Sequence, residues 1–366
     1  MKKKRLGISL YPETCTDEQC LDYLERAASH GFDVLFLALF MSQEDRAGIT
    51  RRYLPITTRA KELGFEIHTD VNPFFLKRMG VKIGLFEGID LSFFTDLKID
   101  AMRLDLGMNE MEEAMLSKNK EGVKIVLNGS TATDHIGAVL ANGGNEDNLI
   151  GCFNYYPHRF TGMSVEHVKD GAQYWAARKL RLQAFVTSQQ PDAVGPWPVD
   201  DGIPTMEVHR SLPIEVQMKH YAMMDEITDV IISNNFASDQ ELAAMAAANT
   251  EAVKFHITPA EGVPAEQLER LSIPLSVRFD CSSGYLVRTL ESRMLPGEVV
   301  PFNNVDIHRG DVLIDNDNYG SYKGEVQIAL CDMPGWERTN VVGHVDDAEH
   351  MLLQYLKPSQ PFGFTW

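Results

Sequence analysis

Residues 1–249 alternate between short apolar runs and amphipathic stretches, which predicts strands that are each followed by a helix. About eight such units follow one another at roughly 30-residue spacing, the pattern of parallel strands joined by helices. The predicted strands are residues 6–10, 34–40, 66–71, 99–107, 124–127, 149–153, 182–186 and 229–232. Polar residues follow nearly every strand instead of gathering at one point. We therefore expect a closed (β/α)8 TIM barrel and not an open doubly wound sheet.

The pattern changes near residue 250, where short alternating strands separated by turn residues replace the strand-then-helix units. Turn signals stand at residues 316–318 and at Pro334-Gly335. We expect two domains, a barrel over residues 1–249 and a smaller, mostly-β domain over residues 250–366.

Composition narrows the choice of partners. The formal net charge is -18, which argues against nucleic acid or an anionic membrane surface as partner because both select for basic patches. No run approaches the ~18 apolar residues of a membrane-spanning helix. The five cysteines are scattered and odd in number, so neither a disulfide framework nor a zinc motif is expected and a reducing cytoplasm is predicted. No metal-ligand spacing or nucleotide-binding loop predicts a metal or cofactor.

Residues 99–107 carry the most unusual predicted strand, since it ends on charged residues. Alternation places Arg103 and Asp105 on the same face, where they are close enough to pair. Buried charges are costly unless they are paired. Two interpretations stay open here: a structural ion pair at the end of a core strand, or a catalytic carboxylate at the carboxyl end of a barrel strand.

Other polar side chains are expected at the same end of the barrel, and they are Glu13, Asp70, Asn128, Asn154, His158 and Arg159. The long segment 191–210 adds Glu207 and His209, and a loop of this length in a compact domain is usually functional. Several carboxylates at one barrel mouth fit a glycosidase, which needs one carboxyl as acid and a second as nucleophile or base.

Roles for these acids follow from their expected surroundings. Asp105 is the candidate ionised partner because Arg103 should lower its pKa. Glu207 is the candidate acid, with a pKa raised under aromatic cover, and Asp70 is the reserve for either role. The alternatives are a surface or helix-cap pair of Glu207 with Arg210, and a simple turn at Asp70.

The second domain holds the densest arginines of this acidic chain, among them Arg278, Arg288 and Arg293. Arginine is suited to bidentate phosphate binding, so these three are predicted phosphate ligands. The alternative is solvated surface arginine.

Taken together, several motifs resemble the bacterial 6-phospho-N-acetylmuramidase family over nearly the whole chain. They are residues 6–13, 103–107, 128–131, 153–157, 161–162, 201–210, 310–316, 319–320 and 324–328. The resemblance implies a TIM barrel followed by a cyclophilin-like β domain. It also implies cytoplasmic hydrolysis of a 6-phosphorylated N-acetylmuramic acid–N-acetylglucosamine disaccharide during cell-wall recycling.

Combined with that resemblance, the residues define one working hypothesis. Asp105 and Glu207 form the carboxylate pair, Arg103 orients Asp105, and the polar strand-end residues, with His209, contact the sugar. The second domain would lie over the barrel mouth, and its arginines would reach the phosphate. Two other functions stay open: another sugar-phosphate enzyme on the same barrel, such as an aldolase or epimerase, and a carbohydrate-binding protein without catalysis.

Overall fold

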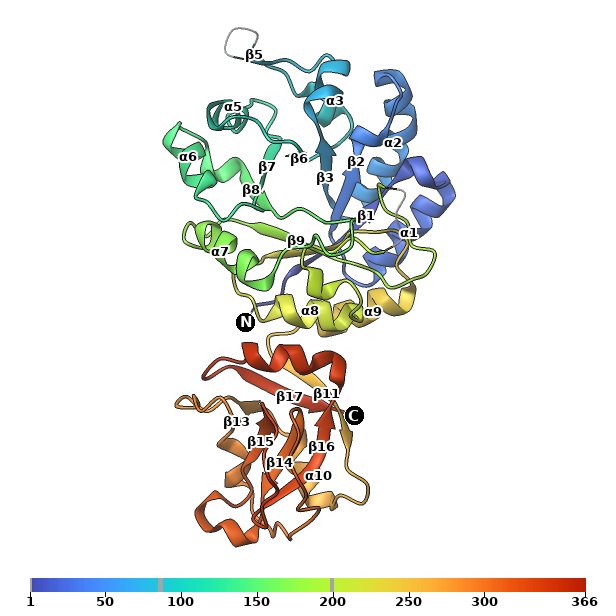
Figure 1. Ribbon diagram of the computed structural model, residues 1–366. Coiled ribbons are helices and arrows are strands. Elements are labelled where there is room, and N and C mark those ends of the chain that lie inside the picture. The colour runs from blue at the N-terminus through green and yellow to red at the C-terminus, as the bar shows by residue number, and fades with distance from the viewer. Residues whose placement is uncertain (1, 85–87, 198–200) are drawn as a thin grey trace. The chain divides into compact units, whose positions relative to one another are not determined.

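The computed structural model describes residues 2–84, 88–197 and 201–366 (Figure 1). The chain divides into two compact units. Lys4–Tyr221 with Asp225–Ala247 make up one, and Ala248–Trp366 make up most of the other. In the described ranges no helix combines the length and apolar character needed to span a membrane.

The first unit is a closed barrel of parallel strands in the order β1-β10-β9-β8-β7-β6-β3-β2 (Figure 1). The predicted TIM-barrel fold is confirmed. The strands are β1 (Arg5–Leu10), β2 (Val34–Ala38), β3 (Glu66–Val71), β6 (Ala101–Leu104), β7 (Lys124–Asn128), β8 (Leu149–Cys152), β9 (Leu182–Val186) and β10 (Asp229–Ile232). A small hairpin of β4 (Ile83–Gly84) and β5 (Gly88–Ile89) is separate from the barrel.

Helices follow the strands as the alternating pattern predicts, and several of them begin at side-chain caps. Thr16 forms a capping box with Gln19 at the start of α1, and Asn109 does the same with Glu112 at α5. The helices of this unit are α1 (Asp17–Ser29), α2 (Arg46–Glu62), α3 (Pro73–Arg78), α4 (Ser92–Asp96), α5 (Glu110–Leu116), α6 (His135–Ala141), α7 (Val165–Ala176), α8 (Ile214–Ala222) and α9 (Asp239–Ala248).

Inside the barrel, side chains are stacked in layers along the axis. The amino-terminal end holds an ion network in which Arg5 and Arg181 both contact Glu66, at 2.6 and 2.7 Å, and Arg181 also contacts Asp229. The middle layer is apolar, and the carboxyl end is polar again. Its apolar members are Val34, Phe36, Ala101, Val126, Ile150, Cys152, Phe185 and Ile231. A packed interior of this kind leaves the carboxyl end of the strands as the place for chemistry.

The second unit contains a mixed sheet in the order β12-β17-β11-β16-β14-β15-β13. Its strands are β11 (Val253–Pro259), β12 (Leu275–Ser276), β13 (Leu286–Arg288), β14 (Asp311–Asp315), β15 (Val326–Ala329), β16 (Thr339–Val345) and β17 (Pro361–Thr365), with one helix, α10 (Ala265–Ser272). The mostly-β character is confirmed. The sequence analysis did not predict α10 or β17.

Short 3-10 helices connect several of these elements, and five of them carry residues discussed below. They are η1 (Pro12–Thr14), η2 (Leu39–Met41), η3 (Glu146–Asn148), η4 (Glu207–His209), η5 (Glu291–Met294), η6 (Asp317–Tyr322) and η7 (Asp347–Tyr355).

Candidate active site

A buried ion pair lies at the carboxyl end of the barrel interior. Asp70 on β3 and Arg103 on β6 stand directly opposite each other in the register of the two strands. Nη1 of Arg103 lies 2.7 Å from each carboxylate oxygen of Asp70, and both side chains are buried. Charges this deep are stable only when paired and hydrogen-bonded, so each residue depends on the other.

Asp105 follows β6 and is the more exposed carboxylate beside this pair. Its Oδ1 lies 3.4 Å from Nη1 of Arg103, and its side chain is 34% exposed. Its backbone N–H donates to the carbonyl of Val71, which extends the strand pairing by one residue. Gly107 then turns the chain with a φ of 68°, a conformation that favours glycine. Arg103 therefore joins two acids, one enclosed and one facing solvent.

The pKa of Asp70 is raised to about 7. Burial is the main cause, and the neighbouring charge of Asp105 acts in the same direction, whereas Arg103 and a hydrogen bond from Tyr155 oppose the shift. Asp70 can therefore hold a proton in the neutral range, which is what a glycosidase requires of its acid.

The loop after β8 supplies two further groups to this place. The side-chain oxygen of Asn154 accepts a hydrogen bond from Nη2 of Arg103. Tyr155 packs edge-on against Phe36 and Phe185, with ring centroids 6.3 and 5.0 Å away, and it is partly exposed. We call Asp70, Arg103, Asp105 and Asn154 the mouth cluster.

Glu207 lies in η4, and both of its carboxylate oxygens accept hydrogen bonds. One carboxylate oxygen accepts from the Phe160 N–H and Nε of Arg210, at 2.9 and 2.7 Å. The other accepts from the Gly162 N–H and Nη2 of Arg210, at 2.8 and 2.7 Å. These contacts use the lone pairs of the carboxylate. We call Glu207, Arg210 and the two loop N–H groups the Glu207 clamp.

The clamp corrects the expected role of Glu207 as an acid. Its hydrogen bond with Arg210, supported by the Phe160 and Gly162 N–H groups, lowers the pKa of Glu207 to about 2. The expectation of a raised pKa under aromatic cover is wrong, since Glu207 is surrounded by donors and stays ionised. The alternative of a pair with Arg210 three residues later describes the geometry.

Two neighbouring loops are joined at this clamp. Oγ1 of Thr205 donates to the carbonyl of Asn154 at 2.9 Å, and the Tyr156 N–H donates to the carbonyl of Pro204 at 3.0 Å. The clamp thereby anchors the loop that delivers Asn154 and Tyr155 to the barrel mouth. Residues 198–200 of the predicted functional segment 191–210 lie outside the described residues.

A hollow of about 570 Å³ lies beside the clamp. It is open to solvent and combines backbone, hydroxyl, amide and charged groups. Its lining residues are Arg159, Phe160, Ser188, Gln189, Gln190, Pro191, Ala193, Asp201, Gly202, Glu207, Val208, Arg210, Ser211 and Asn234. All come from segments that follow β8, β9 and β10, which is where barrel enzymes bind substrate.

Comparison with known protein families accounts for both units. The family model described as 6-phospho-N-acetylmuramidase, N-terminal, matches residues 6–247, and the model described as 6-phospho-N-acetylmuramidase, C-terminal, matches residues 253–365. The chain belongs to the 6-phospho-N-acetylmuramidase family. It is therefore an enzyme, a glycosidase acting on phosphosugars.

Solved structures similar to this muramidase-family chain support the same architecture. An uncharacterized protein from B. cereus is 34% identical, with both chains covered over 100% and a TM-score of 0.90. A conserved protein of unknown function from Enterococcus faecalis is 23% identical, with 99% of this chain and 96% of that chain covered and a TM-score of 0.73, and it shows the fold alone. No match was found among curated proteins.

Three other predicted sugar ligands of this glycosidase lie near strand ends with local partners. Glu13 is exposed in η1 and accepts from the Tyr53 hydroxyl at 3.1 Å. The Asn128 side chain accepts from the Ser130 N–H, a turn contact. His158 is exposed, and its Nδ1 donates to the carbonyl of Arg159. Within the described residues, the hydrogen bonds of these three side chains lead to local partners and not to the mouth cluster.

Arg159 and His209 differ sharply in exposure. The side chain of Arg159 is 56% exposed, lines the hollow and pairs with Asp201. His209 is buried and hydrogen-bonded to His220 at 2.9 Å, and burial lowers its pKa well below the usual value. The expectation that His209 contacts the sugar is wrong because its ring is directed into the packed interior.

The three arginines predicted to bind phosphate already have carboxylate partners. Arg278 pairs with Asp280 at 2.6 Å. Arg288 and Arg293 both contact the buried Glu325, at 2.6 and 3.4 Å. Each of the three is thus engaged with an acid, Arg288 and Arg293 sharing a single carboxylate, and their role as phosphate ligands stays a prediction.

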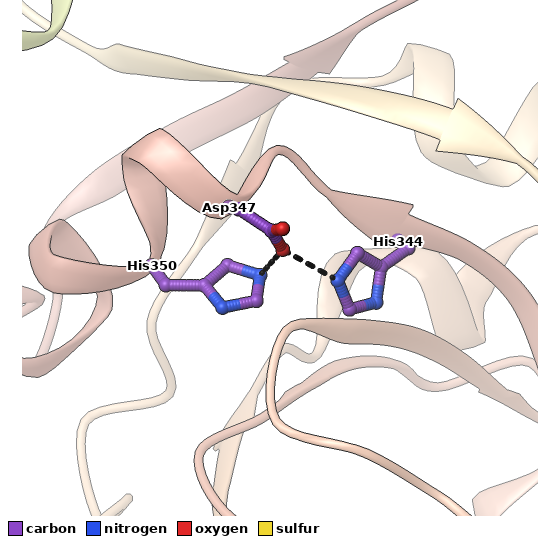
Figure 2. Close-up of side chains that lie close together, drawn as sticks. All are labelled: His344, Asp347 and His350. Carbon is purple, nitrogen blue, oxygen red and sulfur yellow. Dashed lines mark ion pairs between the residues drawn. The ribbon is translucent and has the colours of Figure 1, made fainter. Parts of the chain in front are cut away.

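One group of possible metal ligands occurs within the described residues, in the second unit. Asp347 Oδ1 lies 3.5 Å from Nε2 of His344 and 3.7 Å from Nε2 of His350 (Figure 2). Nε2 of His350 donates to the carbonyl of Val345 at 2.9 Å, so this nitrogen carries a hydrogen and has no lone pair for a metal. Two ligand atoms then remain, fewer than a zinc site requires. We therefore assign no metal-dependent step to these residues.

Proposed function

We propose that this chain hydrolyses the glycosidic bond of a 6-phosphorylated N-acetylmuramic acid–N-acetylglucosamine disaccharide. The observation that carries the proposal is the mouth cluster, two carboxylates on one arginine at the carboxyl end of a closed barrel, in a chain of this family. Cell-wall recycling would supply such a substrate. The five cysteines are free thiols, in keeping with the reducing cytoplasm proposed for the reaction.

Asp105 is the proposed carboxylate that contacts the sugar. It is the more exposed acid of the mouth cluster, and the 3.4 Å contact with Arg103 fixes its position. A carboxylate here stabilises the positive charge that develops on the sugar ring, or attacks the anomeric carbon as nucleophile.

Asp70 is the proposed source of the proton for the leaving group. It is buried, so it acts through the partly exposed Tyr155, whose hydroxyl is hydrogen-bonded to it. Tyr155 would pass its own proton to the glycosidic oxygen and receive the proton of Asp70. Asp70 is thus a positioning and proton-holding residue, and Tyr155 is the group that touches substrate.

Arg159 is the proposed ligand of the 6-phosphate. Its guanidinium is exposed in the hollow, and its partner Asp201 is exposed as well. Such a surface pair contributes little stability, so a phosphate can replace the carboxylate at low cost. This proposal replaces the paired arginines of the second unit.

The test uses purified enzyme with phosphorylated and plain disaccharide, each with and without chelator. We expect cleavage that depends on the phosphate and withstands the chelator. Arg159→Gln should raise KM about tenfold for the phosphorylated substrate alone, whereas Arg178→Gln, at another surface pair, should change nothing. Equal cleavage of both disaccharides would overturn the phosphate assignment.

Asp105→Asn should lower kcat about a thousandfold without unfolding the chain. Asp105→Ala assayed with azide separates the two roles of the carboxylate. A glycosyl azide product identifies a nucleophile, whereas its absence leaves Asp105 as the counter-charge. Unchanged turnover in Asp105→Asn would overturn the proposed function.

A further inference from the structure

A second hollow of about 570 Å³ opens on the sheet of the second unit. Strands β13, β15, β14 and β16 lie side by side in this sheet (Figure 1). Each of the four contributes residues to the lining of the hollow. Its volume falls within the roughly 300–1,000 Å³ of small-molecule sites. The lining residues that carry the inference are Tyr285, Asp315, Tyr319, Tyr322, Gln327 and Trp336, and we call this hollow the β-domain pocket.

Aromatic rings line the entrance of the β-domain pocket. Tyr285, Tyr322 and Trp336 are 59%, 42% and 53% exposed. Tyr319 stacks on Trp336 with ring centroids 6.4 Å apart and planes 22° from parallel. Exposed aromatic rings that converge on one hollow mark a binding surface, because folding of the chain without a ligand gains nothing from leaving them in water.

Hydrogen-bonding groups lie at the base of the pocket. Asp315 accepts from Oγ1 of Thr339 at 2.9 Å and from Nε2 of Gln327 at 3.0 Å. Nε2 of Gln327 also donates to Glu325 at 3.2 Å, so both of its hydrogens are used and its oxygen is left to accept. Each carboxylate oxygen of Asp315 keeps a further lone pair. The base can therefore receive hydroxyl or amide donors.

Two arginines beside the pocket, Arg288 and Arg293, lie close to two acids, Glu325 and Asp315. Glu325 is buried and bound by Arg288 through two hydrogen bonds of 2.6 and 3.1 Å, and by Arg293 at 3.4 Å. Both guanidinium groups also lie over the ring of Tyr322, at 5.6 and 5.1 Å. These contacts hold the aromatic rim in place, and both guanidinium groups are already engaged by Glu325.

We propose that the β-domain pocket binds the ring of a neutral sugar. A pyranose has an apolar C–H face for Tyr319 and Trp336 and a rim of hydroxyl groups for Asp315 and Gln327. The pocket geometry stands on its own, whereas the choice of an N-acetylated amino sugar as ligand rests on the proposed function. All lining residues of the β-domain pocket belong to the second unit, whereas the mouth cluster belongs to the first.

The experiment titrates the full chain with N-acetylglucosamine and follows tryptophan fluorescence and the heat of binding. We expect a fluorescence change that is lost in Trp336→Phe while the heat of binding persists, because phenylalanine keeps a stacking face. Trp336→Ala and Tyr319→Ala should raise the dissociation constant about tenfold. Trp366→Phe, at another of the four tryptophans, is the matched control and should change nothing.

Every outcome decides the proposal. Absence of binding, or binding that is unchanged in both Trp336→Ala and Tyr319→Ala, would overturn it, provided that melting curves show both variants folded. If one alanine variant does not fold, the other and Trp336→Phe still decide. Asp105→Asn distinguishes sugar binding in the pocket from hydrolysis, because this variant should lose turnover and keep the fluorescence change of Trp336. Turnover that persists in Asp105→Asn would sink the proposed function alone.

Discussion

Replacing Glu207 with glutamine tests whether this residue is an acid or an anchor. In the wild type, two backbone N–H groups and the Arg210 guanidinium all donate to the carboxylate. Glutamine keeps the size of the side chain but turns one acceptor oxygen into an NH2 group. Whichever oxygen it replaces, the NH2 group would face N–H donors, so some hydrogen bonds of the clamp must be lost.

The magnitude follows from the pKa of Glu207, which falls from the ordinary 4.5 to about 2. At about 1.4 kcal/mol per pKa unit this corresponds to roughly 3 kcal/mol. The side chain is 27% exposed, and screening by solvent reduces the expected loss in Glu207→Gln to about 2 kcal/mol. Because the pKa is lowered by folding, the stabilisation is complete above pH 4.5 and disappears as the pH falls toward 2.

The assay is urea unfolding of wild type and Glu207→Gln at pH 7 and at pH 3. We expect the difference in unfolding free energy to be present at pH 7 and to shrink at pH 3. Asp201→Asn, at the exposed pair with Arg159, is the matched control and should cost less than about 1 kcal/mol. The opposite result would be a Glu207→Gln variant as stable as the wild type, with kcat lowered about a thousandfold and no alkaline limb in its pH–rate profile. That result would identify Glu207 as the general acid and refute the clamp.

Three further predictions concern the mouth cluster and the clamp. Arg103→Lys cannot bond Asp70 and Asn154 together, so calorimetric melting should show a loss of about 3 kcal/mol. Gly162→Ala places a Cβ 2.7 Å from the backbone nitrogen of Glu207, and denaturant unfolding should show a loss of about 2 kcal/mol. If Asp70 supplies the proton, kcat falls as the pH rises through about 7. Asp70→Asn should remove that limb of the pH–rate profile and cost about a hundredfold at pH 6, whereas an unchanged profile would assign the proton elsewhere.

The barrel was predictable because its signal repeats along the chain. Strands buried on both faces are near-continuous apolar runs, and β3, β9 and β10 have the predicted bounds. The strand of residues 99–107 proved shorter, Ala101–Leu104, because Gly107 turns the chain soon after Asp105. Local sequence could indicate where each strand ends but not how neighbouring strands are aligned.

That alignment decides which acid Arg103 binds. Alternation along one strand correctly put Arg103 and Asp105 on the same face, and the structure gives them a 3.4 Å contact. The shorter contact is to Asp70, which lies 33 residues earlier and opposite Arg103 in the register of β3 and β6. The inward positions of β3 carry His68 and Asp70, a signal of a polar interior that could have favoured this pair. Tyr155, the proposed proton carrier next to Asn154, was not predicted for the same reason.

The charge of the mouth cluster links its burial to its chemistry. With both acids ionised, Asp70, Arg103 and Asp105 sum to one negative charge, which favours the cationic sugar ring of the transition state. When Asp70 is protonated, the three charges sum to zero. The buried contact is then between the Arg103 guanidinium and a neutral carboxyl group. A barrel that enclosed only hydrophobic residues here would be easier to stabilise. The cost of burying Arg103 between two acids is therefore best explained by the two roles proposed for these acids, an enclosed carboxyl that holds a proton and an exposed carboxyl that reaches the sugar.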